Sequence, residues 1–235
     1  MYHPVGIMIL STNQPYFSPY PGFFYKSHLC DVFVLLDGVQ IPRGTTWITR
    51  NRFKNDQGTL WMTIPVWKKG LGLQDIENVR ICHEGHWARK HLASLQQAYA
   101  HAPYFGEHLN FVREMFSDPY DKLIDLNLAI TRYLIEHLAI ETDLKLQSVT
   151  GIHASGTRLL IDLCHYFGAS TFLAQLPARK YLDTDSFQQA GILLKFFTPR
   201  VCIYPQLWGE FIYDLSAFDL LFNCGPKARD ILIAK

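Results

Sequence analysis

The stretch GIMILSTNQPYFSPYPGFFYKSHLCDVFVLLD, residues 6–37, decides the fold class. It begins and ends with short apolar runs, 6–11 and 31–36, of the kind that forms buried strands. Between them lie a loop rich in proline and aromatic residues, 12–22, and a segment able to form a short helix, 23–30. A strand, loop, helix and strand within this length predict a βαβ unit, whose two strands are parallel.

The alternation of strands and helices returns in the second half of the chain. Residues 144–149, 171–174 and 192–197 are strand-like, and residues 158–167 and 183–190 are helical. A glycine follows the first of these helices directly, as a helix C-cap should. These elements extend the parallel sheet that the first unit begins.

The middle of the chain follows a different pattern. Residues 59–65 and 76–82 read as two further strands, and from residue 86 to 140 the apolar residues recur with helical spacing. We therefore expect a single α/β domain over residues 1–235. Its core would be a Rossmann-like, mainly parallel sheet built from βαβ units, with a helical insertion at about 86–140.

The composition excludes several classes of protein. Lys and Arg total 22 and Asp and Glu total 21, so the chain lacks the basic excess of a DNA-binding protein. The five cysteines form no C-x-x-C pair, which argues against a metal site or a disulfide framework. No sequence motif indicates a particular cofactor. Neither a signal peptide nor a membrane-spanning run is visible, so we expect a cytoplasmic protein without membrane insertion.

The proline-rich loop is the first candidate for a binding site. It leaves a strand and enters a helix, so Asn13, Gln14, Tyr16 and the first backbone amides of the helix could face an anion. The alternative is a loop that three prolines and three aromatic residues merely stiffen. Asp37 and Gln40 follow the second strand, at the edge where open α/β sheets bind ligands.

The second candidate is the basic segment RGTTWITRNRFK, residues 43–54. Arg50 and Arg52, with Asn51 between them, could bind phosphate, because a guanidinium offers paired donors to an anion. The spacing alone agrees equally well with a solvated basic strand.

Three further groups of residues are weaker candidates. His86 and Lys90 lie one helical turn apart beside His91, and could transfer protons or hold a phosphate, although a lone helix histidine is more often a partly buried polar residue. Ser155 and Thr157 open a helix, where an ordinary N-cap explains them as well as a phosphate site does. Glu210 lies among aromatic residues near the end of the chain.

Motifs along almost the whole chain resemble the WbqC-like family. The matching stretches, in chain order, are Q-P-x-x-x-P-x-x-G at 14–22, D-V-F-V-x-L-D at 31–37, N-R at 51–52, H-W-x-x-K-H at 86–91, A-P-Y-F at 102–105, S-G-T at 155–157, Y-P-Q-x-x-G-x-F at 204–211 and L-L-F-N-C-G-P at 220–226. In one place the chain departs from the family, which often has histidine where this sequence has Asn13.

The resemblance implies an N-acyl or N-aminoacyl (glycyl-type) transferase. Its acceptor would be a nucleotide-linked amino sugar or similar amine in surface-polysaccharide or small-molecule biosynthesis, and a charged tRNA could be the donor. Asp37, His86 and Lys90 would be the catalytic residues, and the other candidates would bind the ligand. Asn13 motivates the alternative, a non-catalytic nucleotide-sugar-binding protein that assists a neighbouring enzyme.

Overall fold

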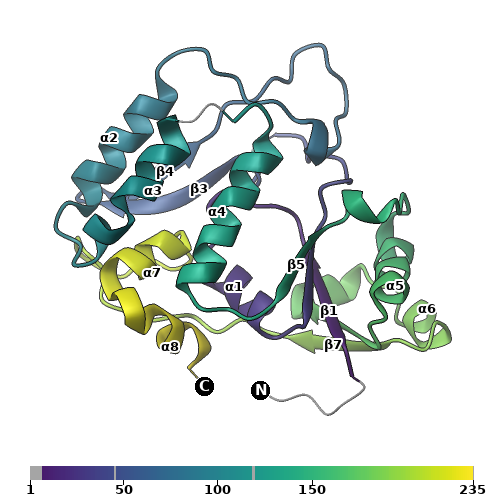
Figure 1. Cartoon of the computed structure of the whole chain (residues 1–235). Coiled ribbons are helices and arrows are strands. Elements are labelled where there is room, and N and C mark those ends of the chain that lie inside the picture. The colour runs from purple at the N-terminus through teal and green to yellow at the C-terminus, as the bar shows by residue number, and fades with distance from the viewer. Residues whose placement is uncertain (1–6, 45, 118–119, 235) are drawn as a thin grey trace. The chain divides into compact units, whose positions relative to one another are not determined.

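The computed structural model describes residues 7–44, 46–117 and 120–234 (Figure 1). Internal contacts divide the chain into two units, each assembled from three segments. The sheet unit comprises Met1–Gln14, Tyr25–Val39 and Glu141–Arg200. The helical unit comprises Pro15–Phe24, Gln40–Ile140 and Val201–Lys235.

The sheet unit contains a five-stranded sheet in the order β5-β2-β1-β6-β7, and every neighbouring pair of strands is parallel. Helices alternate with these strands along the chain, as parallel connections require. The elements are β1 (Ile9–Asn13), α1 (Pro21–His28, which ends in this unit), β2 (Val32–Leu35), β5 (Asp143–Leu146), η2 (Ser148–Thr150), α5 (Gly156–Phe167), β6 (Thr171–Gln175), η3 (Leu176–Lys180), α6 (Thr184–Gln189) and β7 (Leu193–Phe197).

One face of this sheet forms an apolar core with α5 and α6. Leu10 and Val34 of the central strands contribute to it, together with Leu163 of α5. Phe172 of β6 stacks on Phe187 of α6, with ring centroids 5.4 Å apart. The buried central strand β2 (VFVL) is an unbroken apolar run, whereas β1 (ILSTN) buries the polar residues Ser11 and Thr12 as well.

The strand order reverses direction at β1. The chain moves from β1 to β2 and β5 on one side of the sheet, and later fills β6 and β7 on the other. Asn13, at the carboxyl end of β1, pairs with Leu35 of β2. Such a reversal is the edge at which open parallel sheets bind ligands.

The helical unit combines an antiparallel hairpin with a group of helices. Strands β3 and β4 pair in register from Arg50↔Thr63 to Asn55↔Gly58. Helix α2 contacts both β3 and α3, and α7 contacts α3 and α4. The elements are β3 (Arg50–Asn55), β4 (Gly58–Thr63), η1 (Ile76–Asn78), α2 (Trp87–Tyr99), α3 (Phe105–Ser117), α4 (Leu123–His137), α7 (Ala217–Cys224), η4 (Gly225–Lys227) and α8 (Ala228–Ile233).

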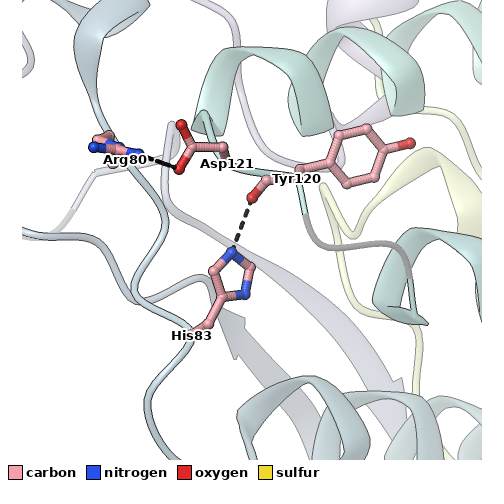
Figure 2. A network of polar contacts seen from close by, with 4 residues as sticks. All are labelled: Arg80, His83, Tyr120 and Asp121. Carbon is pink, nitrogen blue, oxygen red and sulfur yellow. Dashed lines mark hydrogen bonds and ion pairs between the residues drawn. The ribbon is translucent and has the colours of Figure 1, made fainter.

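A polar contact network joins the chain before α2 to the chain before α4 (Figure 2). Arg80 forms an ion pair with Asp121 at 2.9 Å, and the His83 ring donates from Nε2 to the Tyr120 carbonyl at 3.0 Å. In Figure 2 the tyrosine ring points away from His83, so only its backbone takes part. The side chains of Arg80 and Asp121 are exposed, so their ion pair contributes little to stability.

The sequence predictions for the fold class are confirmed. The chain is an α/β protein with a parallel sheet, and the helices after the hairpin form the expected helical insertion. Gly168 caps α5 with a φ of 71°, as its position predicted. The expectation of one domain over residues 1–235 stays a prediction.

The strand expected at 76–82 is wrong. Ile76 begins a short 3-10 helix, and only isolated bridges at Arg80 and Ile81 remain of the expected ladder. Ile76, Val79 and Ile81 are all buried. The first two are three residues apart, as in a helical turn, and the last two are two residues apart, as in a strand. A strand would have buried alternate residues throughout.

None of the helices in the described part of the chain combines the length and the apolar character that a membrane span needs.

His108 is a buried histidine in the aromatic packing between α3, α4 and α7. Only 4 % of the residue is exposed, and its Nδ1 lies 2.7 Å from the Tyr133 hydroxyl. The His137 ring centroid lies 5.1 Å away. Burial, with a smaller contribution from His137, lowers the pKa of His108 to about 4. The imidazole is therefore neutral in the folded protein at pH 7.

We predict that the protein loses stability on mild acidification through His108. Its pKa is lower in the folded state than in the unfolded state, so unfolding takes up a proton between about pH 6.5 and pH 4. The free energy of unfolding should fall by about 3 kcal/mol across this window. Urea titrations at several pH values would measure it. His108→Asn should flatten the dependence, and exposed His101→Asn should not; equal slopes in both variants would contradict the assignment.

Candidate functional site

Two buried asparagines hold the proline-rich loop of the helical unit. Asn51 of β3 donates from Nδ2 to the carbonyls of Phe17, at 3.0 Å, and Ser18, at 2.8 Å. Asn127 of α4 donates from Nδ2 to the carbonyls of Pro15, at 2.8 Å, and Ile48, at 2.9 Å. Buried carbonyls need such donors, and proline residues offer no N–H of their own to pair with a neighbouring segment.

The same loop is also bound to the segment that leads into α7. The Ala217 N–H donates to the Pro19 carbonyl at 2.8 Å, and the hydroxyls of Ser18 and Ser216 lie 2.7 Å apart. Ser18 and Asp214 both adopt the left-handed region, with φ of 48° and 50°. Residues other than glycine rarely do so, and where they do, the surrounding contacts often serve a ligand site.

The loop, β3 and the segment before α7 enclose the first of two hollows. It has a volume of about 240 Å³. Arg52 crosses its wall and donates from Nη2 to the carbonyls of Tyr213, at 3.0 Å, and Asp214, at 3.2 Å. The lining residues are Tyr16, Tyr20, Trp47, Asn51, Arg52 and Asp214.

A second hollow, of about 230 Å³, shares Trp47 with the first. Trp47 and Trp61 stack with centroids 5.8 Å apart, and each residue is more than two-fifths exposed. Arg50 lies flat against Trp61, with Cζ 3.6 Å from the ring centroid. The guanidinium of Arg52 lies 5.7 Å from Trp47. Two cations and two indole rings therefore form one continuous surface, which we call the Arg–Trp site.

Each arginine of the Arg–Trp site has one N–H group that the described residues leave unpaired. The Nε–H groups of Arg50 and Arg52 are buried and have no hydrogen-bond partner among the described residues. An unpaired buried donor costs about 1–3 kcal/mol, so a side-chain rotation that turns the Nε–H toward an acceptor of a bound ligand would recover that cost. The Arg–Trp site is thus suited to an anion attached to a flat ring.

A buried ionic cluster supports the same strand. Lys54, two residues beyond Arg52 on β3, is 1 % exposed and donates to the Gln206 side chain and the Glu210 carbonyl. Burial lowers the pKa of Lys54 and raises the pKa of Asp219, which accepts a 2.6 Å hydrogen bond from Tyr99. These contacts fix the far end of β3, so the strand presents Arg50 and Arg52 from a rigid base.

The described residues contain no group of three or more His, Cys, Asp or Glu side chains arranged to hold a metal ion. The polar groups of the Arg–Trp site are guanidinium, amide and hydroxyl groups and one carboxylate, that of Asp214. Such a set suits anions and polar organic groups better than a metal ion.

Comparison with known proteins identifies the family of the chain. The model of the WbqC-like protein family matches residues 14–231. The chain belongs to the WbqC-like family. An uncharacterized protein of Mycobacterium tuberculosis, Rv1507c, is 31 % identical over 221 residues, which cover 93 % of this chain and 95 % of that protein. No solved structure matches the chain significantly.

Four residues predicted for ligand binding meet in this WbqC-like protein. Tyr16, Asn51 and Arg52 line the first hollow of the Arg–Trp site, and Arg50 lines the second. Asn51 acts through structure rather than through an exposed amide, because its Nδ2 and Oδ1 both bond to backbone.

The other candidates of the helical unit lie outside the Arg–Trp site. His86 and Lys90 are exposed at the start of α2, and the His86 side chain makes no capping hydrogen bond. His91 donates from Nε2 to the Thr63 carbonyl at 2.9 Å, and burial lowers its pKa. Gln40 forms a single bridge with Asp75. The Glu210 side chain is exposed, and only its carbonyl is used, by Lys54.

The remaining candidates belong to the sheet unit. Asp37 is 1 % exposed and accepts hydrogen bonds from the N–H and hydroxyl of Ser148, at 2.9 and 2.6 Å. Asn13 donates to the carbonyl of Gln14 at 2.9 Å. At the start of α5, Ser155 makes no side-chain cap, and Thr157 accepts from the Asp183 N–H at 3.0 Å. Their proposed roles stay predictions.

Sequence reasoning missed Trp47, Trp61, Tyr20, Asp214 and Asn127. One of them had a usable signal: a turn at 55–58 joins two strand-like runs and places Trp61 opposite Arg52. Tyr20 and Trp47 lie inside the two candidate segments, 12–22 and 43–54, but were not singled out within them. Asp214 and Asn127 reach the site through contacts between distant parts of the chain, for which the sequence has no local pattern.

We predict that Asn127 is required for the stability of the loop. Asn127→Ala leaves the carbonyls of Pro15 and Ile48 buried without donors, and should lower the free energy of unfolding by about 3 kcal/mol. Urea denaturation measures the change. Asn110→Ala, on the exposed surface of α3, is the matched control and should stay within about 0.5 kcal/mol of the parent. A loss as small as that of the control would show that the loop is held by other contacts.

Proposed function

We propose that this WbqC-like protein is an N-acyl or N-aminoacyl (glycyl-type) transferase that acts on a nucleotide-linked amino sugar or a similar amine. The proposal rests chiefly on the Arg–Trp site, where two arginines lie against two indole rings and their Nε–H groups have no partner among the described residues. Family membership supports the same reading of the site. We place the reaction in surface-polysaccharide or small-molecule biosynthesis.

A nucleotide-linked sugar satisfies the two kinds of group that the Arg–Trp site presents. Its diphosphate would accept from the free donors of Arg50 and Arg52, which bind anions with directed hydrogen bonds. Its base would stack on Trp47 or Trp61, since indole faces contact flat rings with little selectivity. A ligand with only one of these groups would leave half of the surface unused.

We assign the amine of the acceptor to Asp214, the one carboxylate that lines the first hollow. A carboxylate attracts the ammonium form and can then remove its proton, since only a neutral amine attacks a carbonyl. The new bond joins the amine nitrogen to the acyl carbon, and the bond from that carbon to the donor's leaving group breaks. The donor would be a free acid activated by ATP, a charged tRNA or a carrier thioester. Asp37, His86 and Lys90 stay predicted alternatives for the proton transfer.

A second function is favoured by Asn13. This residue occupies the place where the family often has histidine, and its amide is engaged with the Gln14 carbonyl. An amide cannot act as a general base, so the protein would bind the nucleotide sugar without turning it over and assist a neighbouring enzyme. The two functions share one binding site and differ only in chemistry.

We predict that Arg50→Ala weakens the binding of a nucleoside diphosphate by about tenfold or more, because it removes charge-assisted contacts worth about 1.5–3 kcal/mol. Isothermal titration calorimetry with the parent and the variant measures the change. Arg50→Lys restores the charge without the fork and should recover part of the affinity. Arg50 is a cleaner target than Arg52, whose Nη2 also braces two carbonyls.

Arg89→Ala, at an exposed position of α2, is the matched control for the lost charge and should bind as the parent does. Arg52→Ala should weaken binding and also lower the melting temperature. Equal affinities for the parent, Arg50→Ala and Arg89→Ala would rule out the Arg–Trp site as a phosphate site.

We also predict that incubation with a nucleotide-linked 4-amino sugar, glycine and the right donor yields an amide, detected by its mass. Each donor class is supplied in turn, and Asp214→Asn should bind the sugar nucleotide yet form little product. Ligand-dependent thermal stabilisation without product from any donor would exclude the transferase and leave the binding function. Product formation would exclude the non-catalytic alternative.

A further inference from the structure

Two neighbouring loops of the helical unit expose apolar and cationic side chains together. We call residues 41–44 and 67–74 the loop pair. Trp67, Leu71 and Leu73 are 44 %, 52 % and 54 % exposed. Neither loop contains Asp or Glu, whereas Arg43, Lys68 and Lys69 are all exposed.

Hydrogen bonds hold the loop pair in this arrangement. The Gln74 side chain donates to the Trp67 carbonyl at 3.1 Å and closes the longer loop at its base. The Ile41 N–H donates to the Gln74 carbonyl at 2.9 Å, which fastens the shorter loop beside it. The apolar side chains therefore remain outside although their backbone is tied down.

A hollow of about 370 Å³ lies between the two loops. Arg43 and Lys68 line it from opposite loops, with Pro42 and Leu73 as apolar walls. Lys68 donates one hydrogen bond from Nζ to the Gly44 carbonyl at 3.2 Å, which leaves two of its N–H groups for an anion. The hollow thus places two cations beside an apolar edge.

We propose that the loop pair is a peripheral binding surface for membranes that contain anionic phospholipids. Trp67 would lie at the headgroup level, Leu71 and Leu73 would enter the acyl boundary, and Arg43 and Lys68 would hold a lipid phosphate in the hollow. Tryptophan, leucine and lysine in one patch are the combination that membrane interfaces select. This inference is independent of the function proposed for the Arg–Trp site.

Other occupants fit the loop pair less well. The lysines argue against a protein partner, because lysine is depleted in the buried part of protein interfaces. A nucleic acid would use the cations and the tryptophan, but it would leave the two leucines in water. The chain as a whole has a formal charge of only +1, so three clustered cations orient it toward an anionic surface.

The test is flotation of the full chain with vesicles of phosphatidylcholine, with or without phosphatidylglycerol. The parent should float only with the anionic vesicles, and high salt should release it. Lys68→Gln with Lys69→Gln should lower binding about tenfold or more, since each surface cation contributes about fivefold. Leu71→Ser with Leu73→Ser should lower it comparably without any change of charge.

Matched controls come from the sheet unit. Arg179→Gln with Lys180→Gln removes the same charge, and Val149→Ser with Leu176→Ser removes exposed apolar groups of similar size. Both should bind vesicles as the parent does, and circular dichroism would verify that every variant is folded.

Three results would overturn the proposal. The first is no flotation with anionic vesicles, and the second is equal binding by the loop-pair variants and their controls. The third is loss of binding in the lysine variant only, together with lysine-dependent binding of an RNA duplex, which would assign the surface to nucleic acid.

Discussion

The backbone of the proline-rich loop imposes the constraint from which the candidate site follows. Prolines at 15, 19 and 21 remove N–H groups, but the carbonyls of the loop are still buried and still need donors. Asn51, Asn127 and the Ala217 N–H supply them, from β3, α4 and the start of α7. Satisfying one loop therefore draws three distant parts of the chain together and encloses the first hollow.

The charges of the Arg–Trp site follow from the hairpin. Alternation along β3 places Arg50, Arg52 and Lys54 on one side, and cross-strand pairing places Trp61 opposite Arg52. Lys54 is buried and its ammonium group is bonded to protein, whereas Arg50 and Arg52 each keep an Nε–H that pairs with none of the described residues. One strand thus supplies both a rigid base and a ligand surface.

The sequence predicts this fold better than it predicts the site. The apolar residues at the start of β1, along β2 and in the middle of β6 are local signals, because buried parallel strands are rich in apolar residues. Arg50 and Arg52 are also visible locally, as part of a cluster of positive charge at 43–54. Asn127 could not be found this way, since on α4 it is one polar residue inside an apolar helix face and its acceptors lie far away in sequence. The strand predicted at 76–82 is wrong because Ile76 and Val79 belong to a 3-10 turn and its C-cap, and their apolar spacing resembles that of a strand.

The interleaved path of the chain affects how the protein folds while it emerges from the ribosome. β2 pairs with β5 only after the segment Gln40–Ile140 has been synthesised, and β6 and β7 follow still later. Until then the nascent chain carries two strands with open edges, which other chains could pair with. The helical unit likewise waits for its last segment, Val201–Lys235. No single cut isolates either unit as a continuous fragment, and the sheet unit is complete at Arg200 before the segment Val201–Lys235 can complete the helical unit.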